Sequence, residues 1–230
     1  MIDQDKKKLR DGFYFSVSFL LIFWIIKLVE INFNLDFSRY GIFPRRISGL
    51  WGILFTPFLH KDLHHLFNNS VPFFVSIIGI FYFFRKSSLT ILAGIWLITH
   101  ILIWFVAGNG YHIGASGLVY GFMSFLFFGG AFSNNRNLLG LSLVIIFAYG
   151  TMFWGILPVE TAVSWESHLM GAIVGMLFAF IFRKQGIPPE KFDWEEDEEN
   201  VDDLTDEEID ELIDEKTKIK YRFIPGKKTE

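Results

Sequence analysis

Long apolar segments with very few charged residues constrain the fold of this chain more than any other feature. The 230 residues are 51% hydrophobic and 18% aromatic, and their mean hydropathy is +0.36. Soluble domains rarely have so many hydrophobic and aromatic residues, because they need polar surface to cover their core. Each segment has about 17–22 residues, enough for a helix to cross the hydrocarbon layer of a bilayer. The sequence therefore predicts an all-α polytopic membrane protein.

Six membrane-spanning helices are expected from these segments. Their approximate ranges are 13–31, 65–84, 89–106, 115–132, 138–156 and 166–182. Lys and Arg precede the first segment, separate the second from the third and the fourth from the fifth, and follow the sixth. The links before the fourth and sixth segments have none, although the first link carries four. Because basic residues are retained in the cytoplasm, both termini are expected there.

Charge divides the chain after residue 186. Residues 1–186 have a net charge of +6, whereas the remainder has a net charge of −10. The charged N-terminus is followed by a long apolar run without an Ala-x-Ala cleavage site, which indicates a cytoplasmic flank rather than a removed signal peptide. The expected organisation is a flank, a six-helix membrane domain and an acidic cytoplasmic tail, at residues 1–12, 13–184 and 185–230.

The acidic tail contains one helix signal. Thr205 and Glu208 have the spacing of a capping box, which predicts a short helix at about 206–216. A helix of this length is marginal alone, so it docks on a cytoplasmic partner or on the protein's own cytoplasmic face, or it is part of a solvated tail.

A serine among small residues begins the fourth apolar segment, in the sequence Gly114-Ala115-Ser116-Gly117. Small residues let the backbone turn into a helix and let a neighbour approach closely. The free N–H groups of a helix N-terminus can receive an oxyanion. Ser116 is therefore a candidate nucleophile, and the alternative is an N-cap serine beside a packing face formed by Gly117 and Gly121.

A histidine begins the sixth apolar segment. His168 shares one helix face with Gly171 and Gly175, and this face can pack tightly against the glycine face of the fourth segment. Such packing would bring His168 to Ser116 as a general base. Glu166 faces differently, so a dyad is expected rather than a triad. The alternative is an interface histidine without chemistry.

Two further polar residues begin the second segment. With both termini in the cytoplasm, the second, fourth and sixth segments all begin at the external face of the membrane. His65 and Asn69 are four residues apart and therefore share one helix face. Both side chains can donate the hydrogen bonds that an oxyanion hole needs, although they can equally satisfy loop or backbone groups. Tyr120 lies one turn after Ser116, where it can pack beneath the ring of His168.

The histidines at positions 60, 64 and 65 resemble an iron-binding box of membrane desaturases and hydroxylases, since imidazole clusters suit iron. Such enzymes need several boxes, and the chain has six histidines in total. This enzyme class is therefore a remote alternative, and no metal or cofactor is expected. His60, His64 and His112 receive no catalytic role, and His100 is expected to be buried or to line a cavity. With no cysteine, disulfides and thiolate metal sites are excluded.

At these residues the chain resembles the rhomboid family of intramembrane serine proteases. Three motifs carry the resemblance: G-x-S-G at 114–117, H-x-x-G-x-x-x-G at 168–175, and H-x-x-x-x-H-L-x-x-N at 60–69. The similarity extends over residues 13–184. Two departures concern the usual Trp-Arg of the first loop, for which Arg45-Arg46 and Trp51 are the nearest candidates, and Ser70 with Pro72 after the second-span asparagine.

The resemblance implies Ser116 as nucleophile, His168 as base, Tyr120 stacked on His168, and an oxyanion hole from His65, Asn69 and the Ser116 N–H. It also implies single-span membrane proteins as substrates, which enter laterally from the lipid bilayer and are cleaved near the outer face. Residues 152–154 are candidates for gate packing. An inactive relative that only binds membrane segments is the alternative. The expected location is a bacterial cytoplasmic membrane, without nucleic-acid partners.

Overall fold

Helices make up the described part of the chain. The computed structural model describes residues 2–133, 135–148, 155, 157 and 164–186. Within these residues no β-strand forms, and a single isolated bridge pairs Ile42 with His112. The expected all-helical class is confirmed for this part. The tail beyond residue 186, with its expected helix, lies outside it.

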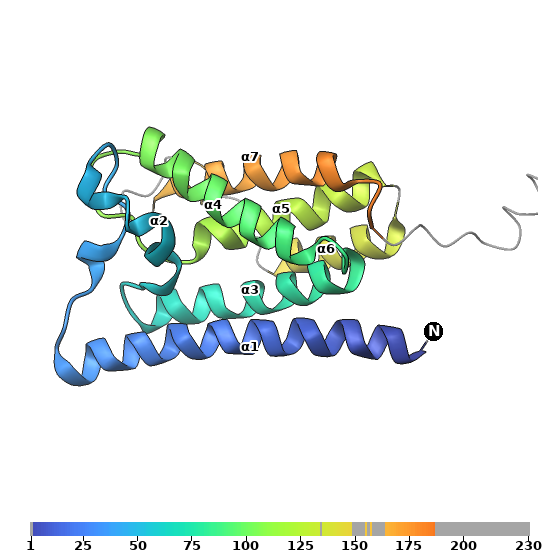
Figure 1. Cartoon of the computed structure of the whole chain (residues 1–230), viewed down its shortest axis with the longest axis horizontal. Coiled ribbons are helices and arrows are strands. Elements are labelled where there is room, and N and C mark those ends of the chain that lie inside the picture. Colours follow the sequence, from blue (N-terminus) through green and yellow to red (C-terminus); the bar gives the residue numbers. More distant parts are fainter. Residues whose placement is uncertain (1, 134, 149–154, 156, 158–163, 187–230) are drawn as a thin grey trace, which may run out of the picture. The chain divides into compact units, whose positions relative to one another are not determined.

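The described residues contain seven α-helices, which follow one another in chain order (Figure 1). They are α1 (Ile2–Phe33), α2 (Gly52–Phe55), α3 (Leu63–Phe83), α4 (Ser88–Val106), α5 (Ser116–Phe132), α6 (Arg136–Ala148) and α7 (Trp165–Phe182). Helices α1, α3, α4 and α7 are long and apolar enough to cross a membrane, and α5 is apolar but one residue shorter than α7. The expected second, third, fourth and sixth spans agree with α3, α4, α5 and α7 to within two residues.

Two expected spans differ from the observed helices. The first was expected from residue 13, but α1 begins at Ile2. The first residues of α1 are polar, and many have unbranched side chains, which favour a helix. Lys8 also pairs with Asp5, one turn earlier, at 2.8 Å. The helix therefore includes the charged flank. The fifth, expected over 138–156, is described as α6 only from Arg136 to Ala148.

Helix α5 lies at the centre of the bundle. It packs against α7 most extensively and also against α3, α4 and α6, while α1 lies along α3. The connection between α1 and α3, with α2, gathers at one end of the bundle (Figure 1). The N-terminus and the end of α7 lie at the opposite end. The starts of α3, α5 and α7 thus share the end that carries the long connection.

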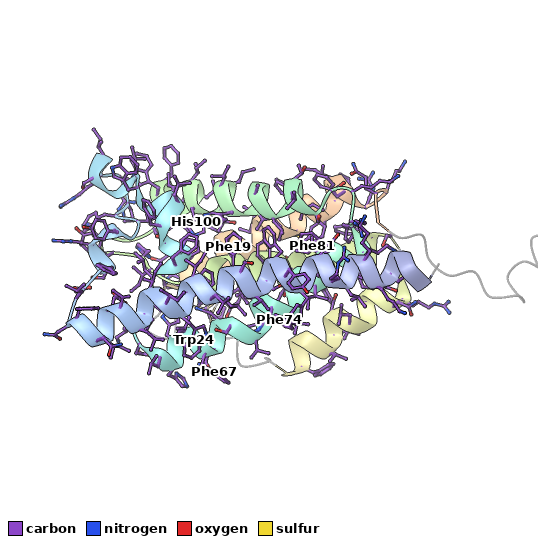
Figure 2. All side chains as sticks on the ribbon, turned by 60° about the horizontal axis from the view of Figure 1, so that its bottom comes forward. Phe19, Trp24, Phe67, Phe74, Phe81 and His100 are labelled. Carbon is purple, nitrogen blue, oxygen red and sulfur yellow. The ribbon has the colours of Figure 1, made fainter. Side chains whose placement is uncertain are left out.

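Aromatic side chains fill the contacts of α1 and also cover the outside of the bundle. Phe19 of α1 contacts Phe73 of α3 and Trp96 of α4, with ring centroids 6.3 and 5.8 Å apart. In contrast, Phe67 is 59% exposed and points away from the bundle (Figure 2). Large exposed apolar residues of this kind suit contact with lipid rather than water.

Glycines bring α5 and α7 into backbone contact. A Cβ atom at Gly171 would overlap the carbonyl oxygen of Gly117, and one at Gly175 would overlap that of Gly121. Only glycine lets the helices approach this closely. The contact of the two glycine faces, expected from the sequence, is therefore present.

The connection between α1 and α3 is ordered around the end of α4. The Arg45 guanidinium donates to the carbonyl oxygens of Ala107 at 2.8 Å and Phe105 at 3.3 Å, and Trp104 Nε1 donates to Arg46 O at 3.0 Å. A cation at the last carbonyls of a helix also complements the helix dipole. Trp51 is 66% exposed, so Arg45 and Arg46 are the residues that anchor the first loop.

Pro72 lies inside α3, which continues unbroken from Leu63 to Phe83. The helix thus absorbs the proline, as transmembrane helices often do.

We predict that Gly171→Ala lowers the free energy of unfolding by about 1–3 kcal/mol, because the added methyl group must push α7 away from α5. Thermal unfolding in detergent measures the loss. The control is Gly140→Ala in α6, where an added Cβ meets no atom within 4 Å and helix propensity alone favours alanine. Equal stability of the two variants would contradict the tight α5–α7 contact.

Candidate active site

The first turn of α5 presents Ser116 at the loop end of the bundle. Gly114 has φ +112°, a conformation that favours glycine, and Ala115 is the N-cap residue. The first bond inside the helix runs from Val119 N–H to Ala115 O at 3.0 Å, so the Ser116 amide has no acceptor within the helix. Within the described residues the Ser116 hydroxyl makes no hydrogen bond. Ser116 is therefore not the N-cap serine of the alternative interpretation.

Thr56 fixes the turn that leads into Ser116. This buried side chain accepts a hydrogen bond from Ile42 N–H at 2.9 Å and donates one to His112 O at 3.1 Å. Its carbonyl oxygen accepts from Gly114 N–H at 3.0 Å. One residue of the first loop thus holds both His112 and Gly114, just before α5. Nothing in the sequence singled out Thr56, since it belongs to none of the three motifs.

His168 is held between a ring and a carbonyl. Its imidazole stacks on Tyr120, with centroids 4.2 Å apart and planes inclined by 12°. Its Nδ1 lies 2.9 Å from Gly155 O. Because a carbonyl oxygen can only accept, Nδ1 carries the hydrogen, and Nε2 is left with a free lone pair. The sequence predicted no carboxylate partner for His168 and did not identify this carbonyl.

Ser116 and His168 share one side of the α5–α7 interface. Tyr120, on which the imidazole stacks, lies one turn after Ser116 on the same face of α5. The neighbouring residues are also close together, since a Cβ at Gly117 would lie 3.3 Å from the carbonyl oxygen of Ser167. No hydrogen bond joins Ser116 to His168 in the described part of the chain. Such bonds are often long in ligand-free enzymes and shorten when substrate binds.

His65 and Asn69 of α3 converge on the same turn. A Cβ at Gly114 would lie 2.8 Å from His65 Nε2 and 3.7 Å from Asn69 Nδ2. Asn69 is buried, and among the described residues its Nδ2 has no hydrogen-bond partner. A buried donor without an acceptor is costly, so a ligand atom that accepts from it would bind favourably. Two side-chain donors and the free Ser116 amide thus surround one small region.

His60 is a further residue of this region that the sequence analysis left without a role. It is buried, its Nε2 accepts from Ala115 N–H at 3.4 Å, and its ring centroid lies 5.2 Å from that of His65. Burial lowers the pKa of His60 to about 3. The signal available in the sequence was its place as the first histidine of the H-x-x-x-x-H-L-x-x-N motif.

The three neighbouring histidines of the iron-box alternative do not converge. His64 is exposed and contacts Asn68, whereas His60 is buried against Ala115. In the part of the chain that the structure describes, no three His, Cys, Asp or Glu residues are grouped to hold a metal ion.

Polar contacts also fix the start of α7. His112 Nδ1 lies 2.6 Å from Ser164 Oγ, which lies 2.6 Å from Ser167 Oγ. Glu166 accepts from Gly108 N–H at 3.3 Å. It therefore holds a loop, and among the described residues no hydrogen bond joins it to His168. The buried His100 donates from Nδ1 to Trp96 O within its own helix. The expected gate residues 152–154 lie outside the described residues.

Comparisons with known proteins agree with the sequence motifs. The family model described as Rhomboid domain matches residues 48–185, from the first loop to the end of α7. Uncharacterized proteins of Mycobacterium bovis and Mycobacterium tuberculosis are each 30% identical over 179 residues, which is 72% of this chain and 72% of theirs. One from Mycobacterium leprae is 29% identical over 180 residues, covering 72% of this chain and 69% of its own.

We predict that the protein loses stability as the pH falls from 6.5 toward 3, because unfolded His60 binds a proton over this range and folded His60 does not. For one proton the slope approaches about 1.4 kcal/mol per pH unit. Equilibrium unfolding in detergent at several pH values measures this slope. His60→Gln should reduce the slope by about this amount, whereas His64→Gln, at an exposed position, should leave it unchanged. A slope unaffected by His60→Gln would contradict the prediction.

Proposed function

The chain belongs to the rhomboid family of membrane proteins, and we propose that it is an intramembrane serine endopeptidase with Ser116 as nucleophile and His168 as general base. Two observations carry the proposal: His168 stacks on Tyr120, one turn after Ser116, and His65 and Asn69 approach Gly114, two residues before Ser116. Relatives that lack activity exist in the family, but this chain keeps every group that the chemistry requires.

In the proposed reaction, Ser116 Oγ attacks the carbonyl carbon of the scissile peptide bond and His168 Nε2 takes the hydroxyl proton. Collapse of the tetrahedral intermediate breaks the C–N bond, and His168 gives the proton to the leaving amine. Water, activated by the same Nε2, then hydrolyses the acyl-enzyme. The bond from Nδ1–H to Gly155 O supports this role, because it holds the tautomer whose Nε2 can accept a proton.

The oxyanion of the intermediate would be bound by the Ser116 N–H and by the side chains of His65 and Asn69. The Nδ2 of Asn69, which has no partner among the described residues, supports this assignment, since a bond from it to the substrate oxygen would strengthen as negative charge develops there. Such a donor binds the transition state more strongly than the substrate, which is what raises kcat.

The chain is an integral membrane protein, and we propose a six-span domain whose site opens at the outer face. The remaining spans would be α5 and α6 with the residues that follow it. Substrates would be single-span membrane proteins entering from the bilayer, because a site inside a bundle is reached most directly by a segment already in the membrane. We place the protein in a bacterial cytoplasmic membrane with both termini cytoplasmic and the acidic tail free to bind a partner there.

We predict that purified wild-type protein cleaves a single-span reporter and that Ser116→Ala and His168→Ala each abolish cleavage. Reporter cleavage in detergent and in liposomes, analysed by mass spectrometry, measures this. Cleavage that survives both substitutions would refute the dyad. If wild-type protein binds several reporters but cleaves none, it is an inactive membrane-protein-binding module instead.

We predict that Asn69→Ala lowers kcat on the order of 10²–10³-fold with little change in KM, because one oxyanion donor is lost. The matched control is Asn68→Ala, since Asn68 precedes it in the same helix and is exposed. His65→Ala and His64→Ala form a second matched pair with the same expected contrast. An equal loss of kcat within either pair would argue against a specific oxyanion role.

A further inference from the structure

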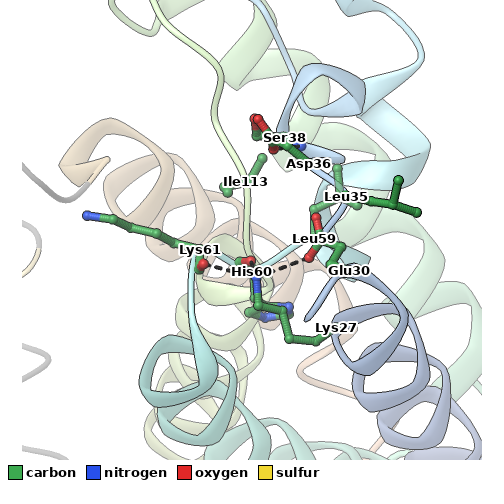
Figure 3. Close-up of a pocket in the computed structure, with 9 residues that line it drawn as sticks. All are labelled: Lys27, Glu30, Leu35, Asp36, Ser38, Leu59, His60, Lys61 and Ile113. Carbon is green, nitrogen blue, oxygen red and sulfur yellow. Dashed lines mark hydrogen bonds and ion pairs between the residues drawn. The ribbon is translucent and has the colours of Figure 1, made fainter. Parts of the chain in front are cut away.

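Two opposite charges are buried in α1, within a segment long and apolar enough to cross a membrane. Lys27 and Glu30 are 9% and 6% exposed, and Lys27 Nζ lies 3.1 Å from Glu30 Oε2 (Figure 3). Ionised side chains in such segments are expensive and generally mark a function. The sequence indicates such a pair, because a Lys and a Glu lie three residues apart inside the expected span 13–31.

The ammonium group of Lys27 uses all three of its hydrogens. Besides the bond to Glu30, it donates to His60 O at 2.9 Å and to Lys61 O at 3.0 Å. Glu30 accepts from Phe37 N–H through its other oxygen at 2.8 Å. The pair therefore fastens α1 to the chain that follows it and to the chain that precedes α3. Figure 3 shows Lys27 and Glu30 meeting the His60–Lys61 backbone from α1.

The backbone of residues 60 and 61, which Lys27 holds, is connected to the proposed oxyanion hole in two ways. The His60 side chain accepts from Ala115 N–H, directly before Ser116. Asp62, which follows Lys61, caps α3 by accepting from His65 N–H at 2.7 Å. A displacement of the His60–Lys61 backbone would therefore reach both the Ser116 turn and the His65 ring.

A cavity lies beside these carbonyl groups. Its volume is about 320 Å³, and it borders Lys27, Glu30, His60 and Lys61. Residues 60 and 61 belong to no helix, so their carbonyl oxygens have no helical donors. Without the ammonium group, this backbone would lose two hydrogen bonds and gain room to move.

We propose that Lys27 is a positioning residue for the oxyanion hole, acting through the His60–Lys61 backbone and held in place by Glu30. The inference rests on the proposed function, since it assigns a role within the same site. Lys27 does not contact the substrate. Its contribution is to hold His65 and the Ser116 amide at the spacing that the developing oxyanion requires, where a displacement of 1 Å can cost about 100-fold in rate.

The test uses Lys27→Met with Glu30→Gln, because Lys27→Met alone leaves a buried carboxylate unpaired and can prevent folding. The Glu30→Gln substitution removes that charge and keeps an acceptor for Phe37 N–H. The matched control is Lys8→Met, which removes a lysine from the same helix and breaks a more exposed pair of the same spacing, with Asp5, at the far end. Reporter cleavage, thermal unfolding and hydrogen exchange are measured on each purified protein.

We expect the double variant to lose roughly 10- to 100-fold in kcat with KM within about twofold of wild type, while Lys8→Met behaves as wild type. Amide exchange should accelerate in the segments 58–66 and 112–117 and stay unchanged in α4. Wild-type kcat in the double variant would overturn the proposal, and so would a loss of kcat that merely follows a loss of thermal stability.

The exchange measurement separates this proposal from the proposed function. If wild-type protein cleaves no reporter, the proposed function fails, yet faster exchange confined to the two segments still supports the positioning role. Unchanged exchange in both segments overturns the positioning role, whatever the cleavage assay shows.

Discussion

The backbone contact between α5 and α7 is the constraint on which the rest of the structure depends. Where Gly117 and Gly121 face Gly171 and Gly175, the two helices lie too close for any side chain to separate them. In a bilayer, association of helices cannot rely on the hydrophobic effect, so close packing of small residues takes its place. This contact stacks the ring of His168 on that of Tyr120, one turn from the candidate nucleophile.

Polar contacts at the loop end of the bundle supply the remaining order. Thr56 and the Lys27–Glu30 pair bind backbone groups that have no donor within an α-helix, and Arg45 binds the last carbonyl oxygens of α4. Such groups are costly where water is scarce, so each of these bonds favours one arrangement of the loops strongly. Within the described residues, specific hydrogen bonds thus fix the segments before α3 and α5, which suits a site whose donors must be in place before charge develops.

Much of the fold was predictable from the sequence, because helices in a membrane must satisfy their own backbone and therefore show as long apolar runs. Four expected spans agree with α3, α4, α5 and α7 almost to the residue. The start of α1 was missed because a charged flank carries no hydropathy signal. Thr56 and Gly155 could not have been identified, since each contacts a residue distant in the sequence from outside the long helices, and no periodic pattern records such contacts.

The sequence by itself determined the helical class, the face on which α5 and α7 meet, and the residue types that a serine protease dyad requires. These follow from short-range rules, namely hydropathy over about 20 residues and the spacing of residues on one helix face. Only the tertiary structure decided which groups support the candidate site residues and the segments around them: the carbonyl of Gly155, the ring of His60, the hydroxyl of Thr56 and the ammonium of Lys27. These groups come from distant parts of the chain, and loop geometry rather than sequence spacing sets the distances between them.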